Sequence, residues 1–175
     1  MRILGAVLAG GRSSRFGSDK ALAIWRGRPL IEHAWAALAP VASDRVICGR
    51  AYGDLPWIED RPTAGLGPLG GLCAALHLAA SRDFDRVVTI GCDTPSVPFA
   101  LIKQLADERG PVFVADLPVL GGWPAALAAD LDAFMANDAR RSVRGWAEVA
   151  GAVPIPAATI PNINAPEDFM GLARG

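Results

Sequence analysis

The chain has 175 residues, of which 51% are hydrophobic and 20% charged, and its formal net charge at pH 7 is −1. These values predict one soluble globular domain spanning residues 1–175, and they argue against binding to nucleic acid or to an anionic membrane surface. No apolar stretch approaches the roughly 20 residues of a membrane span. Cys48, Cys73 and Cys92 are odd in number and widely spaced, which fits neither a disulfide framework nor a paired-ligand zinc site. We therefore expect a cytoplasmic protein with reduced thiols.

Apolar runs of strand length alternate along the chain with helical patterns. The expected strands are Ile3 to Leu8, Arg45 to Cys48, Pro56 to Ile58, Arg86 to Ile90 and Val112 to Ala115. Apolar residues at helical spacing mark three helices, around residues 31–38, 69–76 and 101–105. This repeated β-α-β order predicts an α/β fold, with an open, mostly parallel twisted sheet and helices on both faces. Residues 117–151 are less regular, with an extended piece at 123–127, a helix at about 130–136 and a basic turn.

The first expected strand runs into the loop "LAGGRSSRFGSDK". It lacks the glycine-lysine-serine/threonine core of a P-loop. Gly10 and Gly11 nevertheless let the backbone approach an anion closely, and Arg12, Arg15 and Lys20 add positive charge. In open α/β sheets the ligand lies beyond the carboxyl ends of the strands, where this loop emerges. The loop therefore predicts a phosphate site, and the alternative is a solvated glycine turn with surface cations.

A second glycine cluster, "GLGPLGGL", contains a literal G-x-G-x-x-G at Gly65, Gly67 and Gly70. A dinucleotide-binding fingerprint should follow a strand directly, whereas "DRPTA" precedes Gly65. A helix that starts at Pro68 explains the segment better. Gly70 and Gly71 in its first turns would then leave room either for a nucleotide base or ribose, or for close packing of the helix on the sheet.

Two carboxylates follow expected strands. Asp93 ends "RVVTIGCD" opposite the basic loop, where Mg²⁺ would find one carboxylate beside phosphate oxygens and water. Asp60 ends "PWIED" at the same edge and could accept a hydrogen bond from a base N–H. Turn capping is the alternative for both side chains. Cys92 is expected to be packed rather than reactive.

Near the end, "NINAPEDF" places Asn162 and Asn164 on one side of an extended segment. They could serve a metal-bound water or an incoming phosphate, or Asn164 could cap the helix that Pro166 opens. Weaker candidates are His33 and His77, expected to be packing residues, and Trp123 and Trp146, expected in the core or as stacking surfaces. Arg140, Arg141 and Arg144 form either a patch for an anionic substrate or a solvated face.

Four segments, "LAGGRSSRFGSDK", "GPLGGL", "CDTPSVP" and "NINAPED", together resemble the molybdenum cofactor guanylyltransferases, within the wider molybdopterin nucleotidyltransferases. The resemblance covers residues 3 to about 172 and implies a Rossmann-like nucleotidyltransferase fold. The paired glycines at 10 and 11 and the "GPL" helix start favour GTP over CTP. The implied reaction is attack by the terminal phosphate of molybdenum-molybdopterin on the α-phosphorus of GTP, which gives the dinucleotide cofactor and pyrophosphate.

The resemblance also implies roles for individual residues, with Mg²⁺ at Asp93 and the expected catalytic residues being Arg15, Lys20 and Asp93. The residues that the resemblance implies to bind nucleotide or cofactor are Leu8, Ala9, Gly10, Lys20, Asp60, Asp93, Asn162 and Asn164. The two glycine clusters add Gly11, Gly70 and Gly71 to the expected binding residues. The implied partners are GTP and molybdenum-molybdopterin, with transient contact to molybdoenzymes or their chaperones, and the protein is expected to be a monomer.

Three departures from the family pattern stand out. Trp123-Pro124 stands on the pterin side where many relatives have His-Pro, and Ala165 replaces a common threonine and so removes a hydroxyl cap. The segment after the third expected helix is also short, which affects the pocket for the second substrate. Three other functions stay open. These are nucleotidyl transfer to another acceptor, of cytidylyl or sugar-phosphate type, a nicotinamide oxidoreductase that uses Gly65, Gly67 and Gly70, and a non-catalytic nucleotide-binding maturation factor.

Overall fold

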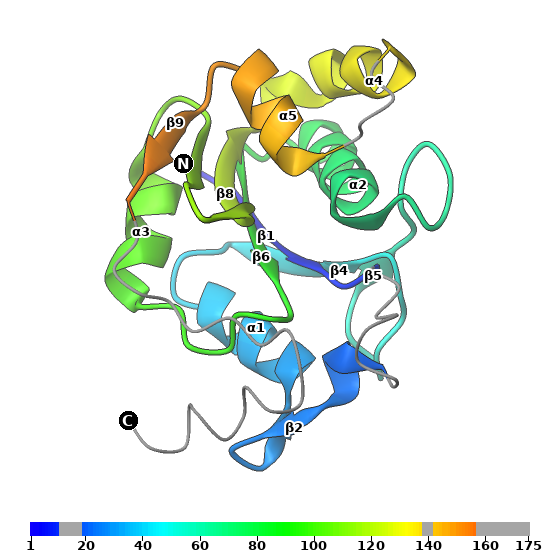
Figure 1. Ribbon diagram of the computed structural model, residues 1–175, viewed down its shortest axis with the longest axis vertical. Helices are drawn as coiled ribbons and strands as arrows, with labels where there is room; N and C mark the ends of the chain where they lie inside the picture. The colour runs from blue at the N-terminus through cyan, green and yellow to red at the C-terminus, as the bar shows by residue number, and fades with distance from the viewer. Residues whose placement is uncertain (11–18, 138–141, 157–175) are drawn as a thin grey trace.

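The computed structural model describes residues 1–10, 19–137 and 142–156, and its centre is a seven-stranded sheet (Figure 1). The strand order is β5-β4-β1-β6-β8-β7-β9. Only β8 runs antiparallel to its neighbours β6 and β7, and a separate two-stranded hairpin pairs β2 with β3. The strands are β1 (Ile3–Leu8), β2 (Ile24–Trp25), β3 (Arg28–Pro29), β4 (Asp44–Cys48), β5 (Trp57–Ile58), β6 (Arg86–Gly91), β7 (Val112–Val114), β8 (Leu117–Pro124) and β9 (Val153–Ile155).

Helices cover both faces of this sheet (Figure 1). One face carries α1 (Leu30–Leu38) and α3 (Phe99–Asp107), and the other carries α2 (Gly67–Ser81), α4 (Ala128–Asn137) and α5 (Val143–Val149). Two short 3₁₀ helices, η1 (Lys20–Leu22) and η2 (Ala125–Leu127), complete the described elements. The predicted α/β architecture, with a mostly parallel sheet between two helical layers, is confirmed.

Strand β1 shows why the sheet is buried on both sides. Leu4, Ala6 and Leu8 contribute to the apolar cluster under α2, α4 and α5, whereas Ile3 and Val7 point into the cluster under α1 and α3. Successive side chains of a strand alternate between faces, so an uninterrupted apolar run supplies both cores at once.

The connections around β1 determine where a ligand can bind. From β1 the chain passes to β4 on one side, and it later returns as β6 on the other side, in parallel register with Leu8 opposite Gly91. The segments that follow β1 and β6 therefore leave the sheet side by side at the same edge. Such a switch point is where open α/β sheets bind their ligands.

Residues 117–151 differ most from expectation. The predicted extended piece at 123–127 is the end of β8 followed by η2, and the predicted helix begins two residues earlier, at Ala128. Trp123 and Trp146 are 0% and 1% exposed, so their expected place in the core is confirmed and the alternative of stacking surfaces is wrong. Arg144 lies on α5 and donates to the backbone carbonyl of Ala115 at 2.5 Å, while Arg140 and Arg141 lie outside the described residues.

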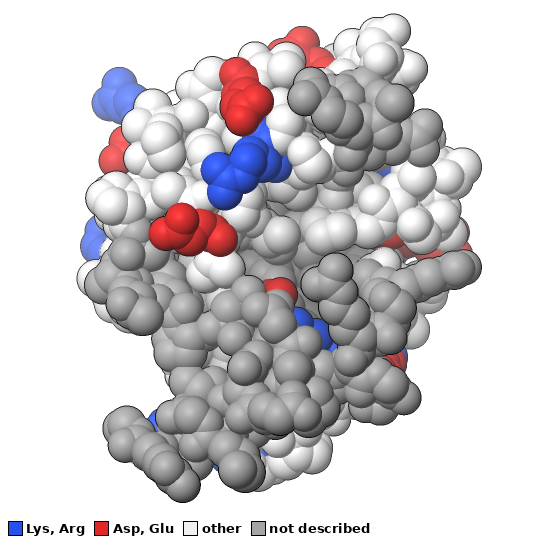
Figure 2. All heavy atoms as spheres, viewed as in Figure 1, with Lys and Arg blue, Asp and Glu red and all other residues white. Residues whose placement is uncertain are grey.

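Charged side chains of both signs lie on the described surface, and the three cysteines lie inside the protein. On the face shown in Figure 2, acidic and basic side chains of the described residues are interspersed. Cys48, Cys73 and Cys92 are buried and form no disulfide. Within the three described ranges, no helix is long and apolar enough to cross a membrane.

Candidate active site

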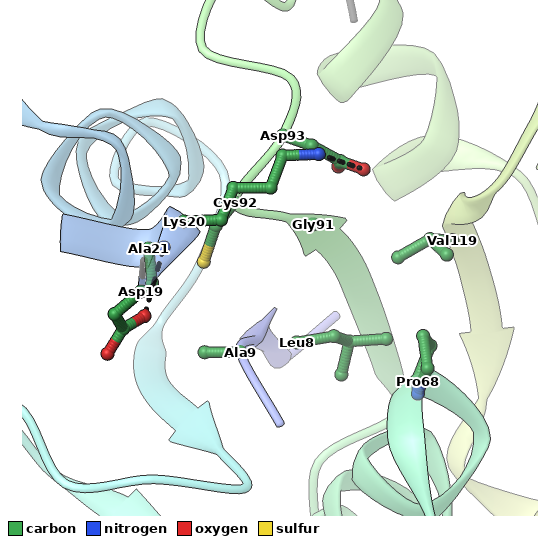
Figure 3. A pocket seen from close by; sticks show the side chains of 10 residues that line it. All are labelled: Leu8, Ala9, Asp19, Lys20, Ala21, Pro68, Gly91, Cys92, Asp93 and Val119. Carbon is green, nitrogen blue, oxygen red and sulfur yellow. Dashed lines mark hydrogen bonds and ion pairs between the residues drawn. The ribbon is translucent and has the colours of Figure 1, made fainter. Parts of the chain in front are cut away.

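A pocket opens at the edge of the sheet where β1 and β6 end (Figure 3). Leu8 and Ala9 line it from the end of β1, and Asp93 lines it from the segment after β6. Figure 3 shows Lys20, at the start of η1, reaching across to Asp93, with Pro68 and Val119 on the opposite wall. The pocket thus has one charged side and one apolar side, and it is built by five segments of the chain, at residues 8–9, 19–21, 68, 91–93 and 119.

The charged side contains the ion pair that links the two predicted functional segments. The Lys20 ammonium lies 3.6 Å from an Asp93 carboxylate oxygen, and the two side chains are 19% and 37% exposed. We expected the first loop and Asp93 to lie at one site, and Lys20, the last residue of that loop, does lie beside Asp93. Such a pair can hold a phosphate and a divalent cation side by side, because each charge complements one of the two groups.

The position of Asp93 depends on a glycine that the sequence did not single out. A Cβ added at Gly91 would lie 2.6 Å from Asp93 Oδ1 and 3.3 Å from Val119 Cγ1. The chain turns immediately after β6, and the Thr94 hydroxyl donates to the Gly91 carbonyl at 3.2 Å. Gly91 therefore leaves room for the carboxylate to fold back over the end of its own strand. The neighbouring Cys92 is buried, and burial, with a smaller effect of Asp93, raises the pKa of its thiol to about 12, as expected for a packed thiol.

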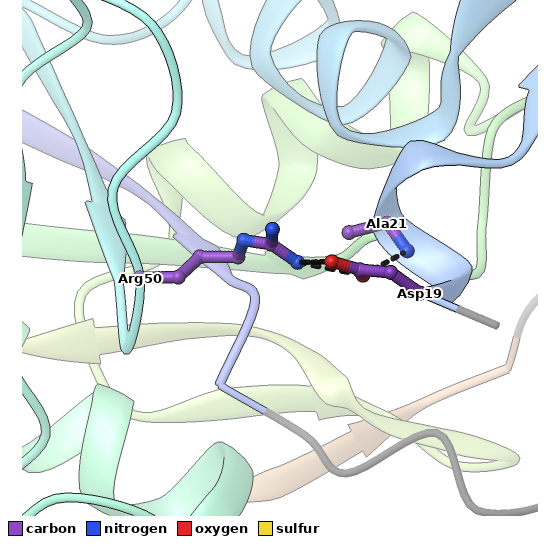
Figure 4. A network of polar contacts seen from close by, with 3 residues as sticks. All are labelled: Asp19, Ala21 and Arg50. Carbon is purple, nitrogen blue, oxygen red and sulfur yellow. Dashed lines mark hydrogen bonds and ion pairs between the residues drawn. The ribbon is translucent and has the colours of Figure 1, made fainter.

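A second ion pair fixes the start of η1 (Figure 4). Asp19 caps this helix by accepting from the Ala21 backbone N–H at 3.2 Å, and it accepts from Arg50 Nη1 at 2.6 Å. Arg50 comes directly after Gly49 at the carboxyl end of β4. The pair connects the loop after β4 to the residue just before Lys20. Sequence reasoning missed both residues. Aspartate is an ordinary capping residue, but the sequence analysis predicts no helix at Lys20 for Asp19 to cap.

Asp60 occupies a separate, buried position beside the same edge. It is 5% exposed, and neither carboxylate oxygen has a hydrogen-bond partner among the described residues. Burial raises the pKa of this carboxyl, while the backbone N–H groups of Gly65, Leu66 and Gly67 lie close enough to oppose the shift. A buried acceptor without a partner is costly, so these oxygens need N–H donors, which either a small shift of the backbone at Gly65, Leu66 and Gly67 or a ligand would supply.

Four glycines pack around Asp60. A Cβ at Gly10 would lie 3.0 Å from Asp60 Oδ2, and one at Gly49, whose φ is +89°, would lie 2.8 Å from Oδ1. At Gly70 an added Cβ would lie 2.7 Å from the Leu66 side chain, and at Gly71 it would meet the side chains of Cys48 and Leu8 at 3.1 Å. Protein atoms thus fill the space over Gly70 and Gly71, which is the close-packing alternative. Their contact with nucleotide stays a prediction.

Several other predicted positions can now be placed. Gly11, Arg12, Arg15, Asn162 and Asn164 lie outside the described residues. A strand directly before Gly65, which the dinucleotide-binding interpretation requires, is not found in the described segment from 19 to 137, because β5 ends at Ile58.

The two histidines have different surroundings. Buried His33 bonds through Nε2 to the Trp25 carbonyl oxygen at 2.7 Å, as a packing residue would. His77 instead pairs with Asp132 on α4, a partner that sequence spacing could not show.

Comparison with known proteins agrees with this geometry. Residues 5–151 match the model of the MobA-like NTP transferase domain. The chain is 38% identical to a molybdenum cofactor guanylyltransferase of Rhizobium leguminosarum bv. trifolii, over 98% of this chain and 92% of that protein.

Two solved structures share the fold. Molybdopterin-guanine dinucleotide biosynthesis protein A from Archaeoglobus fulgidus superposes with a TM-score of 0.76 at 22% identity, over 96% of this chain and 95% of that one. The 2-C-methyl-D-erythritol 4-phosphate cytidylyltransferase of Thermus thermophilus gives 0.72 at 15% identity, over 100% and 99%. The match along residues 5–151 and the close full-length relative show that this chain belongs to the MobA-like NTP transferase family of nucleotidyltransferases.

Proposed function

We propose that the chain is a guanylyltransferase that joins GMP from GTP to the terminal phosphate of molybdenum-molybdopterin and releases pyrophosphate. The observation that carries this proposal is the Lys20–Asp93 pair in the pocket at the end of β1 and β6, in a chain whose close relatives are named for this activity. The proposed substrates are therefore GTP and molybdenum-molybdopterin. The enzyme is proposed to be a cytoplasmic monomer that contacts molybdoenzymes or their chaperones transiently.

The reaction needs alignment and charge neutralisation more than a strong base. A phosphate oxygen of the pterin attacks the α-phosphorus of GTP, the bond from that phosphorus to the bridging oxygen of the β-phosphate breaks, and pyrophosphate leaves with the bond electrons. The nucleophile is already anionic, so no general base is required. In this scheme Lys20 holds phosphate oxygens through charge-assisted hydrogen bonds. Arg15 from the first loop is proposed to help it.

Asp93 suits a magnesium ion. It offers one partly exposed carboxylate in the pocket, while the other pocket carboxylate, Asp19, is held by Arg50. Mg²⁺ in nucleotide sites takes one or two carboxylates and completes its shell with phosphate oxygens and water. When bound, the ion would neutralise part of the triphosphate charge.

The base would lie on the other side of β1. Guanine carries two adjacent donors, N1–H and the N2 amino group, and Asp60 has two acceptor oxygens without partners among the described residues. Asp60 adjoins Gly49 after β4, whereas Asp93 follows β6, so about two strand spacings, roughly 10 Å, separate base site and phosphate site. This span suits a nucleoside phosphate that crosses the end of β1 over Leu8, Ala9 and Gly10, and we propose that Gly11 contacts the same nucleotide. Asn162 and Asn164 are proposed to line the cofactor side.

Calorimetric titration with GTP, CTP and ATP, each with and without Mg²⁺, tests base choice and metal need separately. We expect GTP to bind most tightly and Mg²⁺ to strengthen its binding. Equal affinity for the three nucleotides would contradict the proposed base selection. Pyrophosphate release with molybdenum-molybdopterin and with sugar phosphates as acceptors then separates this enzyme from other nucleotidyltransferases.

A further inference from the structure

Outside the candidate active site, three metal-ligating side chains converge between α2 and α4. Cys73 and His77 stand four residues apart on α2, so both project from one face of that helix. Asp132 on α4 faces them: its Oδ1 accepts from the Cys73 thiol at 3.2 Å, and its Oδ2 lies 2.7 Å from His77 Nε2. One ligand atom from each residue fits within a 4.8 Å span.

We propose that Cys73, His77 and Asp132 form a binding site for a zinc-like divalent cation, which links α4 to α2. A thiolate, an imidazole and a carboxylate are the three donor types that Zn²⁺ takes in proteins. The sulfur and nitrogen donors select this class of ion over Mg²⁺, which prefers oxygen. Three protein ligands leave a fourth position for water.

The hydrogen bonds seen between these groups mark the places that the cation would take. Both the thiol and His77 Nε2 are directed at the same carboxylate, so a cation that replaces the shared protons would meet all three ligands with little movement of the helices. Asp132 offers one oxygen to each of the other two residues, so its carboxylate already faces the position that the cation would occupy. The His77 and Asp132 side chains are 29% and 43% exposed, which gives the ion a path from solvent.

Two groups oppose binding of the cation, the Cys73 thiol proton and the Arg61 side chain. Burial, with a smaller effect of Asp132, raises the pKa of the Cys73 thiol to about 12, so the cation must displace a firmly held proton. The exposed side chain of Arg61 interacts with both Cys73 and Asp132 and must turn away as the second positive charge arrives.

The site is distinct from the proposed magnesium site. Pro68 lines the active-site pocket at the first turn of α2, whereas Cys73 and His77 lie roughly 8 and 14 Å further along the helix at 1.5 Å per residue. Neither Lys20 nor Asp93 is among its ligands.

The test is metal binding by the full chain without nucleotide and in excess Mg²⁺, which occupies oxygen sites and leaves thiolates free. Zn²⁺ affinity is measured by competition with a chromophoric chelator, and Co²⁺ serves as a spectroscopic probe. We expect one equivalent to bind, with a thiolate-to-cobalt charge-transfer absorption in the near ultraviolet. Cys73→Ala should abolish that absorption and weaken Zn²⁺ binding by more than about 100-fold, beyond the loss that an outer-shell change causes.

Three further variants keep the result interpretable. His77→Gln changes a partly exposed side chain and should weaken Zn²⁺ binding even if Cys73→Ala folds poorly. Asp93→Ala and Cys92→Ala should leave the Zn²⁺ affinity and the cobalt absorption unchanged. They also remove a carboxylate and a thiol, but both residues line the active-site pocket rather than the site between α2 and α4. No stoichiometric binding, binding insensitive to His77→Gln, or a cobalt spectrum without a thiolate band would each overturn the proposal and leave only a hydrogen-bonded contact between two helices.

Discussion

The Lys20 ammonium lies 3.6 Å from the Asp93 carboxylate, although the two residues belong to segments that follow different strands of the sheet. The pairing arises because β1 and β6 are parallel neighbours, so that the chain leaves both at one edge. A triphosphate with its cation would separate the pair and give each charge a new partner.

Replacing Asp93 separates metal binding from nucleotide binding. In Asp93→Asn the carboxylate no longer repels the triphosphate, so we expect GTP to bind slightly more tightly in the absence of Mg²⁺. The gain in affinity on adding Mg²⁺ should disappear, and GTP-dependent pyrophosphate release should fall by at least about 100-fold. Calorimetry with and without Mg²⁺ and a coupled pyrophosphate assay measure the two effects. Full turnover at saturating Mg²⁺ would rule out Asp93 as the metal ligand.

Replacing Lys20 removes the proposed phosphate contact. One or more charge-assisted hydrogen bonds, each worth about 1.5–3 kcal/mol, correspond to a loss of about 10- to 150-fold per bond in kcat/KM for Lys20→Met. Lys20→Arg keeps the charge but changes the donor geometry, so it should recover only part of the loss. Steady-state kinetics with GTP distinguish these outcomes. A Lys20→Met enzyme with unchanged kcat/KM would leave the ion pair with a purely structural role.

The sequence predicted some residues of this site and missed others. Lys20 and Asp93 were identified because charged residues that follow apolar strands must lie at the carboxyl edge of a parallel sheet. Arg50 was missed because a single arginine after Gly49 carries no pattern, and its partner Asp19 is recognisable only when β4 and η1 are placed together. Gly91 was missed because its role depends on where the Asp93 side chain turns.

The fold shows the same limits. The buried strands β1 and β6 were predicted nearly to the residue, since continuous apolar runs are strong signals. The antiparallel strand β8 was mostly missed, because "LPVLGGWP" contains two glycines and two prolines. Gly122 in this strand is required by tertiary contacts, because an added Cβ would lie 2.4 Å from Arg86 Nη2 and 2.2 Å from the Leu105 carbonyl oxygen. Single-sequence patterns do not contain such contacts.

Replacing Asp60 should weaken GTP binding but stabilise the fold. Burial raises its folded-state pKa above that of the unfolded chain, so the ionised form is less stable in the folded protein, and this group makes the folded state lose stability as pH rises from about 4. Asp60→Asn should therefore raise Tm at pH 7 and flatten the decline of stability above pH 4. It should weaken GTP binding by about 100-fold, because two charge-assisted contacts to the base are altered.

Glu59→Gln is the matched control for Asp60, because it changes the same charge at an exposed neighbouring position. It should alter neither Tm nor GTP affinity appreciably. Thermal unfolding between pH 4 and 8 and calorimetry provide the two readouts. If Asp60→Asn lowers Tm at pH 7, then the carboxylate has stabilising partners in solution and its proposed role as a reserved acceptor is wrong.

The Asp19–Arg50 pair should contribute to substrate affinity more than to stability. Its side chains are 40% and 26% exposed, and an exposed ion pair contributes only about 0.2–1 kcal/mol. Asp19→Asn keeps an oxygen that can accept from the Ala21 N–H but removes the charge, so we expect a small change in Tm and a several-fold higher KM for GTP. A double-mutant cycle with Arg50→Ala measures the coupling. Additive effects of the two changes on KM would show that the pair does not position η1.

Gly91→Ala tests positioning of the carboxylate without removing it. The added Cβ would lie 2.6 Å from Asp93 Oδ1, and a carboxylate at the end of a short side chain can rotate away at little cost to folding. We therefore expect a Tm within a few degrees of the parent and a loss of kcat of about tenfold or more, because small displacements of aligned groups are expensive in catalysis.

Gly110→Ala is the control, since nothing lies within 4 Å of its added Cβ. Both variants are compared by thermal unfolding and by pyrophosphate release across a Mg²⁺ titration, where Gly91→Ala should require more Mg²⁺ for half-maximal rate. An unchanged Mg²⁺ requirement in Gly91→Ala would mean that the conformation of Asp93 over the end of β6 is not the one that binds the metal.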